Sequence, residues 1–196
     1  AVRLYEKCGE DVKAGDLLRK IGDAVRAEAC YLAAANKLAS RREHLQAGDL
    51  IRTKTGRLDL ANEQYCAGWR EQRSDAVVCG QRLLDGVLAR GDEEALDLLL
   101  ADAAGRLAPP RSTDAGRFFN YALQVSPGFL PDDRVNDLRD LVRVQFAAHL
   151  RAGGSGTGRV KVDTLFDREW PAAVRRDATF AVAQLRETPA ATPPPP

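Results

Sequence analysis

Side chains able to perform chemistry are few in this sequence, and their spacing does not assemble a site. The four cysteines form no C-x-x-C pair and have no histidine at a zinc-ligand spacing. Both histidines fall on predicted helices, outside any ligand pattern. We therefore expect buried, reduced thiols among apolar neighbours. The four thiols belong to Cys8, Cys30, Cys66 and Cys79, and the two histidines are His44 and His149.

Two other patterns look like catalytic motifs but lack an essential part. The glycine-rich run at 153–158 (GGSGTG) has no Gly-Lys-Ser/Thr ending and no preceding strand, so we interpret it as a linker rather than a phosphate-binding loop. Asp132 and Asp133 are adjacent carboxylates, but they lie at a predicted helix start, where the helix dipole favours acidic residues. We therefore do not interpret them as a catalytic pair. Neither H-E-x-x-H nor G-x-S-x-G occurs. We expect no enzyme activity, cofactor or metal.

Charge and hydropathy narrow the classes of partner. The 196 residues carry a net charge of +1, divided into +3 over 1–73, −4 over 74–150 and +2 over 151–196. This balance provides no strong field for nucleic acid, so RNA binding by the helices is a weak alternative. No run of 18 apolar residues and no signal peptide is present, which predicts a cytoplasmic protein without a membrane contact.

Both ends of the sequence indicate a piece of a larger protein. The chain starts at Ala1 and contains no methionine. It ends in TPAATPPPP, a composition that favours a disordered or polyproline tail or a linker. The abundance of Ala, Arg and Leu over Lys indicates a GC-rich bacterial source. We expect further domains to flank this segment.

Apolar periodicity and Gly or Pro breaks predict helices almost throughout the chain. A helical domain is expected over 1–151, followed by a connector (152–158), an extended arm with a C-terminal helix (159–187) and a disordered tail (188–196). The helices are expected at 1–8, 11–21, 24–39, 42–54, 57–72, 75–90, 93–107, 113–125 and 132–151, with a last one at 172–186. Ser112 or Thr113 is the expected N-cap of the helix that ends near 125.

An internal repeat decides how these helices are arranged. Ala14-Gly15-Asp16 recurs 33 residues later as Ala47-Gly48-Asp49, and weaker copies follow at Cys79-Gly80 and Ala115-Gly116. On the intervening helices, a second signature recurs after 34 residues: Gly22, Ala27, Tyr31 and Ala34 become Gly56, Ala61, Tyr65 and Gly68. Small residues at helical spacing let two helices approach closely. Stacked copies then bury faces that a lone hairpin exposes.

This pattern resembles the tetratricopeptide repeat (TPR). Ala14-Gly15-x-x-Leu18 is similar to the signature of that family's first helix, and the second signature is similar to its second helix. The match is good over 1–72, degenerate over 73–151 and absent afterwards, and the family's closing proline is missing. The resemblance implies an all-α fold: a right-handed superhelical stack of antiparallel helix pairs, a TPR-like α-solenoid.

The resemblance also implies a concave face, built from first helices, that holds an extended peptide or a partner helix. The candidate partner-binding residues are Asp16, Arg19, Lys20, Asp49, Arg52 and Thr53, with Gln81 and Asp85 weaker. Their cations could pair with acidic groups of a peptide, or could simply solvate the surface. In the opposite register, Tyr31, Tyr65 and Trp69 would lie near the groove, but we expect these aromatics in the core.

The function expected from these features is non-catalytic. We predict a protein–protein interaction or scaffolding module that binds a peptide or partner domain on a helical-repeat surface. The partner is expected to be another protein, a peptide or other domains of the same chain. The alternative is a structural spacer or regulatory arm within a multidomain bacterial enzyme or a defence or signalling assembly. Repeat solenoids serve many unrelated systems, so the fold alone does not choose between the two.

Overall fold

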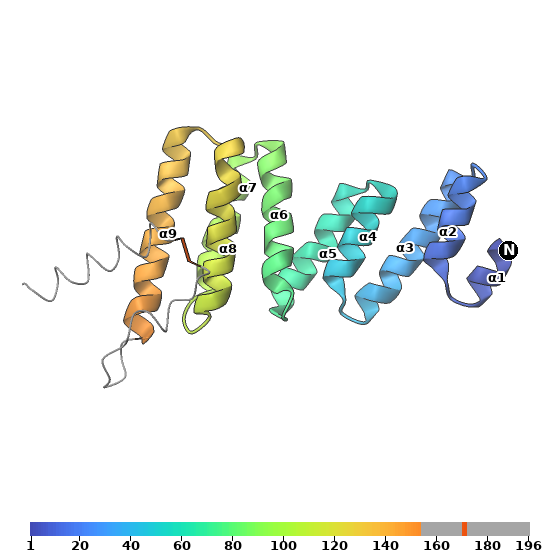
Figure 1. The fold of residues 1–196 in the computed structure, drawn as a ribbon, viewed down its shortest axis with the longest axis horizontal. Helices are drawn as coiled ribbons and strands as arrows, with labels where there is room; N and C mark the ends of the chain where they lie inside the picture. The colour runs from blue at the N-terminus through green and yellow to red at the C-terminus, as the bar shows by residue number, and fades with distance from the viewer. Residues whose placement is uncertain (154–169, 172–196) are drawn as a thin grey trace, which may run out of the picture. The chain divides into compact units, whose positions relative to one another are not determined.

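The computed structural model describes residues 1–153, 170 and 171 of the chain, and every regular element among them is helical (Figure 1). The α-helices are α1 (Val2–Lys7), α2 (Asp11–Lys20), α3 (Ala24–Ser40), α4 (His44–Thr55), α5 (Leu58–Glu71), α6 (Ala76–Arg90), α7 (Glu93–Arg106), α8 (Ser112–Val125) and α9 (Asp132–Gly153), with a 3₁₀ turn η1 (Ser126–Gly128). The predicted all-α class and all nine helix positions in this part of the chain are confirmed.

The breaks between helices follow from local chemistry. Gly22, Gly56 and Gly91 adopt positive φ values of 85°, 73° and 63°, a conformation that costs glycine little. Asp23 and Asp92 then cap the next helices, because each side chain accepts a hydrogen bond from a backbone N–H of the first turn. Glycines with positive φ and capping aspartates therefore determine where one helix ends and the next begins.

The expected cap of α8 is wrong. Ser112 or Thr113 was the predicted N-cap, but Arg111 occupies that position and makes no side-chain cap bond. Ser112 is instead the first helical residue. Its hydroxyl and carbonyl oxygens lie within hydrogen-bond distance of the indole nitrogen of Trp170. A tertiary contact therefore takes the place of a local cap.

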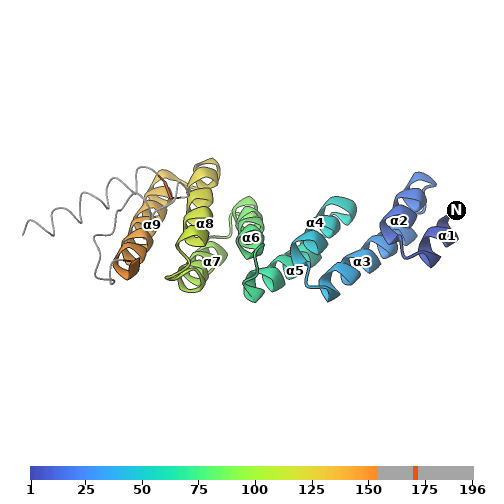
Figure 2. The ribbon, with the colours of Figure 1, turned by 60° about the horizontal axis from the view of Figure 1, so that its bottom comes forward.

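The chain divides into two compact units, 1–86 and 87–196, with the division inside α6. In the first unit, helices adjacent in sequence pack against each other from α1 to α5, and α2–α3 and α4–α5 run back on one another as hairpins (Figure 2). Its buried apolar residues are Ala14, Leu18, Ala27, Tyr31, Ala35, Ala47, Ile51, Ala61, Tyr65, Trp69, Ala76, Val77, Cys79 and Leu84. The prediction that Tyr31, Tyr65 and Trp69 belong to the core is confirmed.

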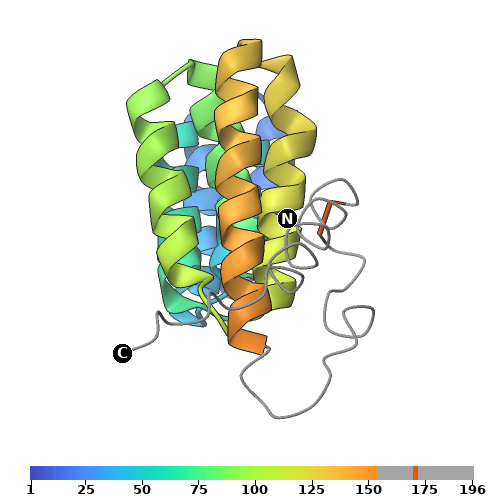
Figure 3. The same ribbon diagram turned by 90° about the vertical axis from the view of Figure 1, so that its left-hand side faces the viewer.

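The second unit is built from the end of α6 and from α7, α8 and α9. Figure 3 looks onto α9. Aromatic rings dominate its core, including an edge-to-face pair of Phe118 and Phe119 with centroids 5.4 Å apart. Its buried apolar residues are Val87, Leu88, Leu96, Leu100, Ala103, Leu107, Ala115, Phe118, Phe119, Ala122, Val135, Leu138, Val142, Phe146 and Trp170.

Exposed apolar side chains occur at helix ends and on the face of α9 opposite its buried residues. Ile21 is 67% exposed because it follows the last residue of α2, and Leu58 is 60% exposed at the first position of α5. Val144 is 64% exposed. It lies two positions from both Val142 and Phe146, which are buried, and a step of two residues reaches the far side of a helix.

The four cysteines are free thiols, as predicted, but their burial differs from the expectation. Cys79 is buried, Cys30 and Cys66 are intermediate, and Cys8 is exposed. Cys8 follows the last residue of the short helix α1, which buries none of its side chains. The prediction of a buried thiol is therefore wrong for Cys8.

The predicted C-terminal elements lie almost entirely outside the described residues. Only 152, 153, 170 and 171 of the connector and arm are described, and the helix at 172–186 and the tail at 188–196 stay predictions. None of the helices in the described part combines the length and hydropathy needed to cross a membrane.

Candidate interaction surface

The repeat glycines of the first unit accommodate aromatic rings. A Cβ added to Gly15 would lie 2.6 Å from Cε1 of Tyr31, and one added to Gly48 would lie even closer to Tyr65. Both distances are shorter than real carbon contacts, so only glycine fits at these positions. In each hairpin, a tyrosine of the second helix therefore packs directly onto the backbone of the first.

The aspartate after each glycine binds the same tyrosine. Tyr31 donates its hydroxyl hydrogen to Oδ1 of Asp16 at 2.8 Å, and Tyr65 donates to Oδ1 of Asp49 at 2.7 Å. Burial and then this carboxylate raise the pKa of Tyr31, and the same causes raise that of Tyr65 well above its usual range. The repeat thus encodes a Gly-Asp step on one helix and a tyrosine on the next.

Each aspartate also binds a cation from a later helix. Nζ of Lys54 lies 2.7 Å from Oδ1 of Asp16 and connects α4 to α2. Nε of Arg82 lies 3.3 Å from Oδ1 of Asp49 and connects α6 to α4. Hydrogen bonds from Lys54 and then Tyr31 lower the pKa of Asp16. Two of the predicted site residues are therefore internal acceptors that join successive hairpins.

The arginine on α2 is held from two sides. Arg19 donates to the backbone carbonyl of Lys54, and its guanidinium carbon lies 5.4 Å from the centroid of the Tyr31 ring. Nζ of Lys54 lies 5.5 Å from the same centroid. Both contacts have cation–π distances. The Arg19 head is exposed but fixed in place.

The remaining predicted residues differ in how they are held. Nη2 of Arg52 lies 3.6 Å from Oδ1 of Asp49, and the hydroxyl of Thr53 donates to the Asp49 carbonyl at 2.7 Å. Lys20 is exposed and makes no hydrogen bond or ion pair with the described residues. Thr53 therefore satisfies its donor within its own helix, whereas Lys20 is available to a partner.

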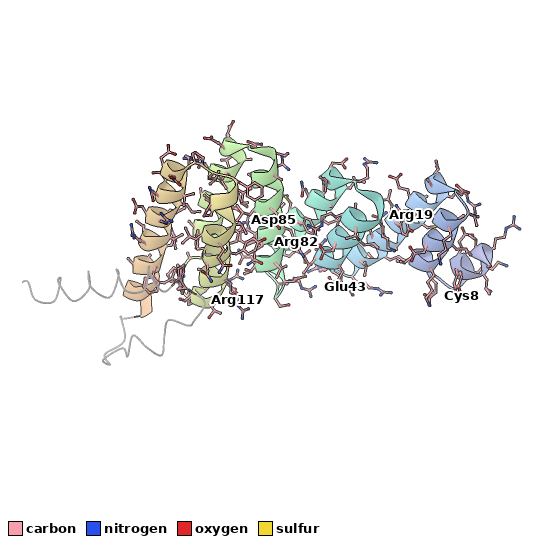
Figure 4. The ribbon with its side chains drawn as sticks, turned by 45° about the horizontal axis from the view of Figure 1, so that its top comes forward. Cys8, Arg19, Glu43, Arg82, Asp85 and Arg117 are labelled. Atoms are coloured by element: carbon pink, nitrogen blue, oxygen red, sulfur yellow. The ribbon has the colours of Figure 1, made fainter. Side chains whose placement is uncertain are left out.

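Together these side chains form a surface with excess positive charge. We call Arg19, Lys20, Arg52, Lys54 and Arg82 the basic surface. The carboxylates that form ion pairs with its cations belong to Asp16, Asp49 and Asp85. Figure 4 labels Arg19 on α2, and Arg82 and Asp85 on α6. Sequence reasoning missed Lys54 and Arg82, because the Gly-Asp repeat identifies the acceptors but not the cations that reach them.

The weaker repeat copy on α8 has a different aromatic partner. A Cβ on Gly116 would lie 2.8 Å from Cδ1 of Trp170, and the indole N–H of Trp170 donates to the Ser112 carbonyl at 3.0 Å. The Trp170 ring is 1% exposed and lies among the rings of Phe119, Phe146 and His149, with centroid distances of 6.3, 5.1 and 5.6 Å. Sequence reasoning gave Trp170 no role, since 54 residues separate it from Gly116.

A histidine completes this aromatic cluster. His149 is 3% exposed, and neither ring nitrogen has a hydrogen-bond partner among the described residues. Burial lowers the pKa of His149. The imidazole therefore packs as a neutral ring, and protonation would place a charge in an apolar core.

No protein-family model, curated protein or solved structure matches this chain. In the described part of the chain, no three His, Cys, Asp or Glu side chains are grouped so that they could hold a metal ion. The resemblance to the TPR therefore rests on the repeated residues of the sequence alone.

Proposed function

We propose that this chain is a non-catalytic interaction module with a TPR-like superhelical arrangement, whose basic surface binds an acidic peptide or an acidic patch of a partner domain. The supporting observation is that the aspartates of the Gly-Asp-Tyr contacts bind cations of α4 and α6, Lys54 and Arg82, while the basic surface has five cations to three carboxylates. Carboxylates are the natural partners of such a surface.

Binding is favoured when a cation of the surface is already held in position before the peptide binds. Arg19 already pays the entropic cost of a fixed position through its contacts with Lys54 and Tyr31. A peptide carboxylate that reaches Arg19 therefore immobilises less side chain than it would on an ordinary helix surface. Electrostatic attraction of this kind speeds association and weakens as salt rises.

Two of the four thiols are poorly suited to nucleophilic catalysis. Burial raises the pKa of Cys30, and burial followed by nearby carboxylates raises the pKa of Cys79 to about 12. Nucleophilic cysteines need the opposite shift, because the thiolate is the reactive form. These two cysteines are therefore packing residues.

Selection from an acid-rich peptide library, followed by anisotropy measurements with labelled binders, tests this function. Lys20→Glu with Arg52→Glu should weaken binding about tenfold or more, which corresponds to about 1.4 kcal/mol. The matched control is Arg41→Glu with Arg70→Glu, at the ends of α3 and α5, which should bind as the parent does. The proposal would be overturned if the two double variants weakened peptide binding equally, or if neither variant weakened it.

A further inference from the structure

The Trp170 ring fills a site that is built by two helices to which it does not belong. The groups that surround the ring come from α8 and α9 and are Ser112, Gly116, Phe119, Phe146 and His149. We call these residues the indole site. The segment 154–169 separates Trp170 from the end of α9 in the sequence. The tyrosines over Gly15 and Gly48, in contrast, belong to the same hairpin as their glycine.

Each part of the indole has a matching group in this site. The planes of Trp170 and Phe119 are inclined by 24°, a stacked arrangement, and the Phe146 centroid is 5.1 Å away. The indole N–H donates to the Ser112 carbonyl at 3.0 Å and lies 3.3 Å from the hydroxyl oxygen of the same residue. A Cβ on Gly116 would lie 2.8 Å from the ring. Tryptophan alone combines a ring of this size with an N–H donor, so the indole site selects it over other aromatic residues.

The backbone that carries the ring is not helical. Trp170 lies in a bend and is followed by Pro171, and a residue before proline disfavours the helical region. A non-helical segment with one buried aromatic anchor is a common way for a peptide to bind a folded surface. Trp170 and Pro171 therefore have the form of a peptide anchor that is joined covalently to its own site.

Covalent linkage changes the concentration of an anchor but not the contacts that it makes. A short flexible link raises the effective concentration of a tethered group to about the millimolar range. The same segment on a separate chain can make the same ring contacts and the same hydrogen bond, and it lacks only this advantage. Occupancy of the indole site by Trp170 is therefore a competition that another tryptophan segment can enter.

We propose that the indole site is a recognition site for a Trp-Pro segment of a protein, occupied in cis by Trp170 and open to the same chemistry from a second chain. A second copy of this chain carries such a segment, and a partner protein with a Trp-Pro sequence would present the same groups. The indole site belongs to the second unit and contains no residue of the basic surface, so it is independent of the function proposed above.

The test measures binding of a labelled peptide, residues 165–173 (LFDREWPAA), to the full chain with Trp170→Ala. The peptide should bind and raise the urea midpoint of this variant, because a ligand of the folded state stabilises that state. A peptide with Ala in place of Trp should bind at least about tenfold more weakly, and the parent chain should also bind the Trp peptide at least about tenfold more weakly, since Trp170 competes. Adding Gly116→Ala to the variant should weaken binding by narrowing the site, whereas adding Gly105→Ala, where the space is open, should not.

Two further variants cover the case of misfolding and identify the source of the segment. Trp170→Phe keeps a ring but lacks the indole N–H, so it should fold and still admit the peptide even where Trp170→Ala does not fold. Gly116→Ala, which disfavours its own indole, should form a heterodimer with Trp170→Ala in sedimentation experiments when a second copy supplies the segment. Peptide binding without a heterodimer assigns the segment to another protein. A peptide that binds neither Trp170 variant at about 1 mM, or equal binding of the Trp and Ala peptides, overturns the inference.

Discussion

In the α2–α3 and α8–α9 hairpins, an aromatic ring packs against a glycine of the first helix, but the ring comes from a different part of the chain in each case. In each, a glycine of the first helix leaves a space that an aromatic ring must fill. In α2–α3 the ring is Tyr31, sixteen residues after Gly15, and its hydroxyl binds the adjacent Asp16. Over Gly116 the ring is Trp170, which comes from beyond α9. A repeat can therefore be completed locally, or by a distant segment that restores the missing ring.

Replacing Trp170 by Ala should have the largest effect on this comparison. It removes a fully buried indole from among Phe119 and Phe146 and should destabilise the second unit by about 3–5 kcal/mol. Urea unfolding followed by circular dichroism measures the loss. Phe129→Ala, at an aromatic that is 58% exposed, is the control and should change stability little. A Trp170→Ala loss below 1 kcal/mol would show that Gly116 needs no ring.

Adding a single methyl group at Gly48 should disrupt the contact between this glycine and Tyr65 in the α4–α5 hairpin. Gly48→Ala places a Cβ 2.4 Å from Cε1 of Tyr65 and should cost about 1–3 kcal/mol, because the ring or the helix must shift. Gly105 on α7 is the matched control, since nothing lies within 4 Å of its added Cβ. Gly105→Ala should stabilise the chain by up to about 1 kcal/mol through helix propensity. Equal effects at both glycines in thermal unfolding would contradict the assigned role of Gly48.

The acid sensitivity of the two hairpins should also differ. The pKa of His149 is lowered by burial, so the unfolded chain binds a proton more readily than the folded chain. The stability that this neutral ring provides is complete above about pH 6.5 and is lost as the pH falls below that value, by at most about 1.4 kcal/mol per pH unit. Urea midpoints between pH 7.5 and 5 should fall less in His149→Leu than in the parent. Equal slopes would rule out His149 as the source.

These contrasts mark how far the sequence could predict the structure. Helix positions and the buried tyrosines followed from periodicity and from the repeat, both of which are local. The contacts of Asp16 with Lys54 and of Gly116 with Trp170 span 38 and 54 residues, and no pattern in the sequence links their members. The use of the six predicted site residues by a partner stays a prediction.

The smallest predicted effect separates the ring of the tyrosine from its hydroxyl. Tyr31→Phe keeps the ring over Gly15 but removes the donor to Asp16, and should cost about 1 kcal/mol because Lys54 still binds the carboxylate. Since hydrogen bonds hold the Asp16 pKa below its ordinary 3.8, this stability is present above about pH 4 and is lost as the pH falls further. The difference between Tyr31→Phe and the parent should therefore shrink at pH 3 in urea unfolding. A loss as large as that of Trp170→Ala would mean that the hydroxyl, and not the ring, completes the local hairpin.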